Sequence, residues 1–146
     1  MGSRTSLTLT NDALFHVFFA RHQDLLLRML EAVLGRKIES LTVLNPTLPG
    51  EVNVAKVIVL DVRAQLEDGS RVDIEIQVRV TAALRARLVY YGCRNLTQQL
   101  VSGEDYRALR SSIVVVWMVE PLFPDAEAFH SVYELRERQT GRLFSE

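Results

Sequence analysis

The chain has 146 residues, of which 48% are hydrophobic and 24% are charged, and its formal net charge is −1. This length suits one domain with a core that buries roughly two-thirds of the surface exposed by the unfolded chain. The apolar runs are far shorter than the ~20 residues of a membrane span and no signal pattern is present, so we expect a cytoplasmic protein without membrane contact. Because the net charge is near zero, any contact with DNA has to be made by a local group of basic residues.

The first half of the chain predicts a helix that follows an N-terminal arm of residues 1–10. Asn11 or Asp12 provides the N-cap, apolar residues then recur at helical spacing, and Gly35 ends the pattern. We therefore expect one long amphipathic helix that reaches Gly35.

A β-hairpin is predicted after a short strand at 38–44 and a Pro-containing loop. Its strands, at about 57–66 and 72–80, are separated by residues 67–69, Glu-Asp-Gly. A loop of these three residues, with Gly69 in the left-handed conformation, aligns the apolar faces of the two strands. A two-residue turn would instead place apolar positions opposite polar ones.

A second helix is predicted from Thr81, as its cap, to about Val101. Its apolar residues form one stripe at helical spacing, which we expect to pack against the core: Val89, Cys93, Leu96 and Leu100. Cys93 cannot form an internal disulfide, because the chain has one cysteine, and it is expected to be a buried thiol.

The rest of the chain predicts further strands, which gives an α/β domain. Almost continuous apolar residues at 112–119 favour a strand covered on both faces, after a helical turn near Tyr106. Residues 129–136 alternate like another strand, residues 139–141 form a turn, and residues 142–146 begin a strand-like segment without a following partner.

The predicted hairpin register brings two acidic residues together. Asp61 stands directly opposite Glu75, with Cβ atoms roughly 5 Å apart, and Gln77 lies one diagonal step away. Facing carboxylates repel unless a cation or a proton lies between them, and Mg²⁺ typically binds one or two carboxylates together with phosphate and water. The alternative is that both acids lie on a solvated face near Arg63 and Arg79.

A series of short motifs runs in order along most of the chain: Asn11-Asp12 with Phe15 and Phe19, Leu44-Asn45-Pro46, Leu60-Asp61-Val62-Arg63-Ala64, Asp68-Gly69, Ile74-Glu75-Ile76-Gln77, Tyr90-Tyr91, Gln99-Leu100, Gly103, Asp105-Tyr106 and the 129–141 stretch. In this order the motifs resemble the PD-(D/E)XK nuclease family transposases, which include recombination-promoting nucleases. The resemblance implies a restriction-endonuclease-like core, with a central mixed β-sheet flanked by helices.

The resemblance also implies roles for the three hairpin residues. Asp61 and Glu75 match the acids that ligate Mg²⁺, for which Mn²⁺ can substitute. Gln77 matches the family's variant of the lysine in the name-giving motif. A neutral amide stabilises a developing negative charge less strongly than lysine, which bears on the rate rather than on the metal site.

Other residues are candidates with two interpretations each. Asp12 either completes the metal site or serves only as a helix cap, and Lys56 either contacts a phosphate or is an exposed strand lysine. Four residues of the second helix share the face away from the apolar stripe and form either a DNA-binding rail or a solvated face: Arg87, Tyr91, Arg94 and Gln98. Gln99 belongs to a family-like motif and is a further candidate for DNA contact.

The sequence thus predicts a metal-dependent DNA endonuclease domain of a transposase or recombination-promoting nuclease, at residues 11–146. The chain ends early for this family, so the expected domain is truncated at its C-terminus. The alternative function is a catalytically inactive remnant that serves as a binding or oligomerisation module. A homodimer through residues after about His130 is expected, because the last strand-like segment exposes an unpaired edge.

Overall fold

The computed structural model describes residues 12–44, 47–48, 58–59, 62–125 and 127–145. Its elements in chain order are α1 (Asp12–Arg21), α2 (Gln23–Leu34), β1 (Leu41–Leu44), β2 (Thr47–Leu48), β3 (Ile58–Val59), β4 (Val62–Leu66), β5 (Arg71–Gln77), α3 (Leu84–Thr97), the 3₁₀ turn η1 (Tyr106–Ala108), β6 (Ser112–Met118), β7 (Leu135–Arg136) and β8 (Leu143–Ser145). The predicted N-terminal arm, residues 1–10, lies outside the described residues.

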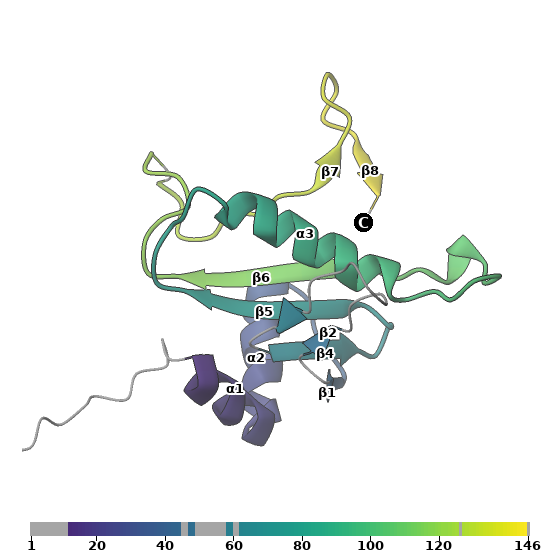
Figure 1. Cartoon of the computed structure of the whole chain (residues 1–146), viewed down its shortest axis with the longest axis horizontal. Helices are drawn as coiled ribbons and strands as arrows, with labels where there is room; N and C mark the ends of the chain where they lie inside the picture. Colours follow the sequence, from purple (N-terminus) through teal and green to yellow (C-terminus); the bar gives the residue numbers. More distant parts are fainter. Residues whose placement is uncertain (1–11, 45–46, 49–57, 60–61, 126, 146) are drawn as a thin grey trace, which may run out of the picture.

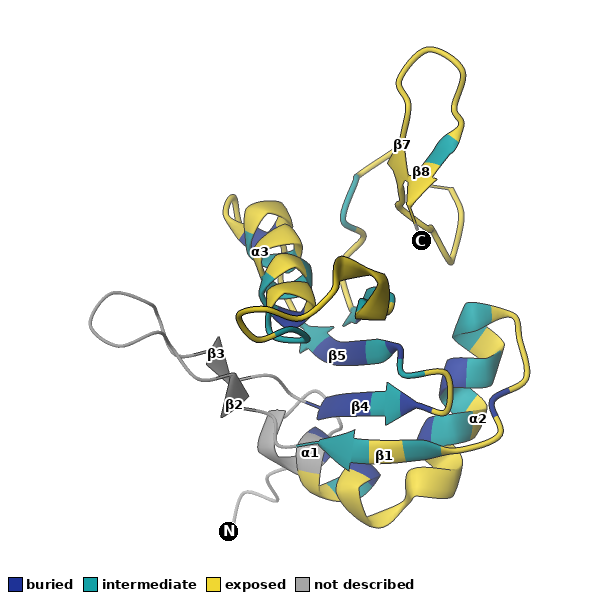
Figure 2. Ribbon diagram, turned by 90° about the vertical axis from the view of Figure 1, so that its right-hand side faces the viewer, coloured by how far each residue is buried: buried dark blue, intermediate teal, exposed yellow. Residues whose placement is uncertain are grey.

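The central sheet has four described strands in the order β1-β4-β5-β6. β1, β4 and β5 are antiparallel neighbours, whereas β6 runs parallel to β5, so the sheet is mixed as predicted. α3 contacts β5 and β6, while α1 contacts β4 and α2 contacts β1. The helices therefore form two layers, with α3 on one face of the sheet and α1 and α2 on the other (Figures 1 and 2).

The hydrophobic core lies between the sheet and the pair α1 and α2. Alternate residues of β4 and β5 point into it, because successive strand side chains face opposite sides of a sheet. The core includes Phe15, Phe19, Leu26, Leu30, Val62, Ala64, Leu66, Val72 and Ile74, all of them buried. The apolar faces that the sequence predicted for the hairpin are confirmed.

The prediction of one long first helix is wrong, because the helix breaks at His22. The backbone of His22 has φ −120° and ψ 63°, and its carbonyl accepts hydrogen bonds from the N–H groups of Leu25 and Leu26. An unbroken helix over 12–34 would be about 34 Å long. The described strands of the sheet have seven residues at most, or about 23 Å. The break lets both halves pack on this short sheet.

The β4–β5 hairpin has the predicted three-residue loop and register. Leu66 N–H donates to the Ser70 carbonyl at 2.9 Å, and Gly69 adopts a left-handed conformation with φ 85°. Val62 pairs with Ile74 and the register continues to the loop without a shift. This confirms, over the described part of the strands, the alignment from which the opposition of the two acids was predicted.

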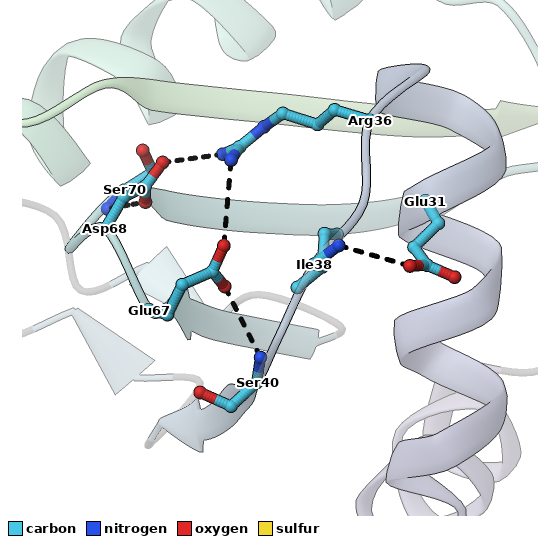
Figure 3. A network of polar contacts seen from close by, with 7 residues as sticks. All are labelled: Glu31, Arg36, Ile38, Ser40, Glu67, Asp68 and Ser70. Carbon is cyan, nitrogen blue, oxygen red and sulfur yellow. Dashed lines mark hydrogen bonds and ion pairs between the residues drawn. The ribbon is translucent and has the colours of Figure 1, made fainter.

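Polar contacts tie this loop to the chain that follows α2 (Figure 3). Arg36 Nη2 lies 2.7 Å from Asp68 Oδ2, and Arg36 Nη1 lies 3.8 Å from Glu67 Oε1. Asp68 Oδ1 accepts the Ser70 N–H at 2.8 Å, and Glu67 Oε2 accepts the Ser40 N–H at 3.5 Å. Such partly exposed ion pairs add little stability each, but together they fix the position of the hairpin loop.

Of two predictions about later elements, one is wrong and one is confirmed. α3 begins at Leu84 behind an Ala83 N-cap without a side-chain bond, so Thr81 is not the cap. β6 contacts α3 on one face and the hydrophobic core on the other, as predicted for a strand covered on both faces, although in it only Val115 is buried. Parallel pairing with β5, and not full burial, accounts for its β-branched residues.

The C-terminal segment also differs from expectation. Residues 129–134 form no strand, whereas β8 pairs with β7 in an antiparallel hairpin that projects from the rest of the described chain (Figure 2). The last segment therefore pairs with a strand that precedes it, and the absence of a following partner stays a prediction. The turn at 139–141 is confirmed, with Gly141 at φ 69°, and so is the helical turn at Tyr106.

We predict that Gly69→Ala destabilises the protein more than Gly103→Ala does. Both glycines have a positive φ, at which alanine costs roughly 1 kcal/mol. A Cβ at Gly69 would in addition lie 3.0 Å from Arg110 Cγ, whereas one at Gly103 would meet nothing within 4 Å. The crowding adds about 1 kcal/mol, to be measured by urea denaturation. Equal losses in the two variants would show that Arg110 moves aside freely.

Candidate active site

The polar face of the central strands is buried beneath α3. Asp73 is 0% exposed, Glu75 is 4% exposed and Arg63 is 7% exposed. On β6 the hydroxyl of Ser112 donates to the Gly92 carbonyl of α3 at 2.8 Å, which places the helix directly on this face. The alternative in which the polar residues lie on a solvated face is therefore wrong for Glu75.

Glu75 occupies the middle of the sheet, as predicted. It lies on β5, between β4 and β6, and its parallel neighbour on β6 is Val116. Its predicted partner Asp61 lies outside the described residues, as does Lys56, and no side chain is described for Asp12 at the start of α1. The facing of Asp61 and Glu75 stays a prediction, based on a register that the neighbouring residues follow.

Gln77, the last residue of β5, makes a close contact with α3. The Nη2 group of Arg87 donates to Gln77 Oε1 at 2.5 Å, and the guanidinium carbon of Arg87 lies 5.9 Å from the centre of the Tyr91 ring. Arginine has only donors, so Gln77 has to present its amide oxygen to Arg87. The amide nitrogen of Gln77 is left to donate elsewhere.

The predicted rail residues lie on the sheet side of α3 and not on a solvated face. Arg87, Tyr91, Arg94 and Gln98 are all half-buried. Near the end of the helix, Arg71 Nη1 donates to the Gln98 carbonyl at 3.2 Å. The side chain of Gln99 is held by the backbone of Arg110, through bonds of 2.8 and 2.9 Å. It fixes the chain before β6.

The chain has been compared with known proteins. The family model of the PD-(D/E)XK nuclease family transposase matches residues 9–146. The chain belongs to this family. No curated protein and no solved structure matches the chain.

Membership in the family confirms the resemblance on which the site was predicted. The mixed sheet between helices fits the restriction-endonuclease-like fold of PD-(D/E)XK nucleases. These nucleases generally use divalent metals and act on DNA. In the described part of the chain, no helix is long and apolar enough to cross a membrane.

The apolar stripe of α3, which was predicted to pack against the core, faces outward instead. Val89 is 67% exposed, and Cys93 and Leu96 are also exposed, so the expected buried thiol is wrong. The sheet face beneath α3 carries arginine and carboxylate side chains, which require polar partners when buried. The polar stripe of the helix supplies such partners to Arg63, through Asn95, and to Gln77, through Arg87.

A buried polar cluster of Arg63, Asp73 and Asn95 was missed in the sequence. Arg63 Nε and Nη2 donate to Asn95 Oδ1 at 3.2 and 2.8 Å, and Arg63 Nε lies 3.7 Å from Asp73 Oδ1. Arg63 and Asp73 are direct partners in the hairpin register, so their opposite charges were a usable signal. No such signal pointed to Asn95, because its inward position depends on the orientation of α3.

Burial raises the pKa of Asp73 to about 7, although the positive charges of Arg63 and Arg71 lower it. Neither carboxyl oxygen of Asp73 has a hydrogen-bond partner among the described residues. Desolvation thus outweighs the attraction of an arginine that is shared with Asn95.

A cavity of about 690 Å³ lies apart from these side chains. Its lining comes from the β4–β5 loop, the end of α3, η1 and β8, and includes none of the candidate residues. Within the described ranges no cluster of three His, Cys, Asp or Glu side chains could hold a metal ion. A metal site on β5 would therefore depend on Glu75 together with a residue such as Asp61.

We predict that Asp73→Asn flattens the pH dependence of stability in EDTA. Between pH 4 and about 7 the folded carboxyl keeps a proton that the unfolded one loses, since the pKa rises from 3.8 to about 7. The stabilisation is complete at low pH and is lost as the pH rises through this window. The stability of the parent relative to the variant should fall by about 1.4 kcal/mol per pH unit.

Chemical denaturation at half-unit pH steps measures this difference. The matched control is Asp125→Asn, at an exposed aspartate, which should run parallel to the parent. If the stability of Asp73→Asn also changes with pH in parallel with the parent, Asp73 ionises as freely in the folded protein as in the unfolded one.

Proposed function

We propose that the chain is a Mg²⁺-dependent DNA endonuclease domain, of a transposase or recombination-promoting nuclease, that hydrolyses phosphodiester bonds. The observation that carries the proposal is the position of Glu75, a carboxylate buried on a central strand of a nuclease-family chain, with Gln77 two residues further along the same face. Asp61 and Glu75 would hold the metal, and Asp12 is a candidate third ligand. The DNA would be cut in the cytoplasm.

The donor set fits Mg²⁺. Mg²⁺ prefers oxygen ligands and usually keeps water and substrate phosphate in its shell beside one or two carboxylates. Glu75, which is 4% exposed, offers carboxylate oxygens of the kind that Mg²⁺ prefers. When bound, Mg²⁺, or Mn²⁺ in its place, activates water and polarises the phosphate.

The protein's own groups would orient the reactants. Because Gln77 gives its amide oxygen to Arg87, its amide nitrogen is available to hold the oxygen of a water or of the phosphate. Arg94 and Gln98, on the sheet side of α3, and Lys56 and Gln99 are the proposed further contacts with DNA. Tyr91 would offer an aromatic face for stacking.

We predict that Glu75→Gln and Asp61→Asn each abolish nicking of supercoiled plasmid. Even the hydrogen-bond partners of metal ligands cost 10–100-fold when mutated, so the loss of a direct ligand should exceed about 100-fold. The assay compares Mg²⁺, Mn²⁺ and EDTA, and metal should raise the melting temperature of the parent but not of the variants.

Glu127→Gln is the control, since this glutamate is exposed. A variant of Asp61 or Glu75 that cuts like the parent would remove that residue from the site. A parent that neither cuts nor gains stability from metal would favour the second function, an inactive binding or oligomerisation module.

That second function rests on the exposed apolar side chains around the β7–β8 hairpin. Phe129 is 97% exposed and Phe144 is 78% exposed, with Val132, Tyr133 and Leu135 between them in the chain. So many large apolar side chains on one projecting segment are typical of a surface that binds another protein. A homodimer through this segment is compatible with either function.

We predict a concentration-dependent homodimer that is weakened by Tyr133→Ser combined with Phe144→Ser. Each serine removes an aromatic side chain that two copies would bury against each other. Light scattering over a wide dilution range measures the dimer. Val101→Ser, which changes a residue 73% exposed outside the hairpin, should leave it unchanged. A parent that stays monomeric at high concentration would rule the dimer out.

A further inference from the structure

The residue at the third position of the proposed site carries no positive charge. Cleavage of a phosphodiester builds negative charge on the phosphate oxygens, and a preorganised cation or donor there lowers the barrier. Gln77, at the end of β5, is a neutral amide and supplies no charge. A positive charge beside Gln77 can come from another element.

Arg87 of α3 brings a guanidinium group to the position of Gln77. Its Nη2 donates to Gln77 Oε1 at 2.5 Å, and its stem lies over the sheet, half-buried. The guanidinium carbon lies 5.9 Å from the centre of the Tyr91 ring. Tyr91 thus limits the directions that the group can take.

In the described part of the chain, no acidic side chain neutralises the charge of Arg87. No salt bridge there includes Arg87, and its Nε, although buried, has no hydrogen-bond partner among the described residues. Arg63, on the same face, is by contrast engaged by both Asn95 and Asp73. A guanidinium has five donors, and the bond to Gln77 uses one of them.

We propose that Arg87 is a catalytic residue of the nuclease, which contacts the scissile phosphate and stabilises its developing charge. Gln77 and Arg87 together do what one lysine does in the name-giving motif: Arg87 carries the charge, and Gln77 orients the guanidinium through its amide oxygen. This assignment rests on the proposed nuclease function. It gives Arg87 a part in the chemical step and not only in holding DNA.

The test is a rescue experiment in single-turnover plasmid cleavage. Arg87→Met keeps the apolar stem and should lower the rate about 100–1000-fold, the usual loss for a donor that stabilises transition-state charge. Gln77→Lys in the Arg87→Met background restores a cation at the same place and should recover the rate to within about tenfold of the parent. Arg87→Lys keeps the charge but not the planar guanidinium, so it should retain more activity than Arg87→Met and less than the parent.

Two further measurements separate chemistry from folding. Arg85→Met is the control: Arg85 is exposed and lies over Phe123, with its guanidinium carbon 5.4 Å from the ring centre, and its loss should not change the rate. Binding of a short DNA duplex in EDTA should lose about one phosphate contact in Arg87→Met, seen as a salt slope smaller by about 0.9.

The outcomes are distinct. If the parent cuts and Arg87→Met cuts equally well, or if Gln77→Lys gives no rescue, the role of Arg87 is overturned while the nuclease stands. If Arg87→Met and Arg87→Lys lose activity equally, Arg87 has a structural role and the inference is overturned. If the parent does not cut with either Mg²⁺ or Mn²⁺, the nuclease function itself is overturned.

Discussion

The arrangement of this domain depends on a layer of polar side chains buried between the sheet and α3. Buried charges are tolerated only when other groups compensate them, and an uncompensated one costs several kcal/mol. Arg63 on β4 meets Asp73 across the hairpin and Asn95 on the helix, and Gln77 meets Arg87. These pairings require the polar stripe of α3 to face inward, so Val89, Cys93 and Leu96 are left on the outer surface.

This layer couples the position of α3 to the site. Glu75 and Gln77 stand on a strand that pairs on both sides, and the apolar core on the opposite face holds that strand in place. Arg87, Arg94 and Asn95 belong to the helix that closes the polar face. A rigid strand thus supplies the carboxylate, and a docked helix supplies the positive charge, so correct docking of α3 is a condition for any chemistry here.

The sequence predicted the features that depend on neighbouring residues. Alternation along 62–66 and 71–77, with the left-handed Gly69, determined the hairpin register, because only one loop length aligns the apolar faces. The break at His22 and the inward face of α3 could not be predicted in the same way. Phe19 and Leu26 keep helical spacing across the break, and Val89 and Leu96 form a regular apolar stripe although they are exposed. Both outcomes depend on what the rest of the chain places opposite the helix.

A strand motif can change its third residue without losing the charge when another element supplies the cation. A lysine in place of Gln77 would carry the positive charge on β5 itself, at a half-buried position. A glutamine costs less to bury, and its amide oxygen can accept a hydrogen bond from an arginine of another element. The cation then reaches the site on Arg87, which is half-buried as Gln77 is. Moving the charge from strand to helix therefore makes the charge depend on helix docking.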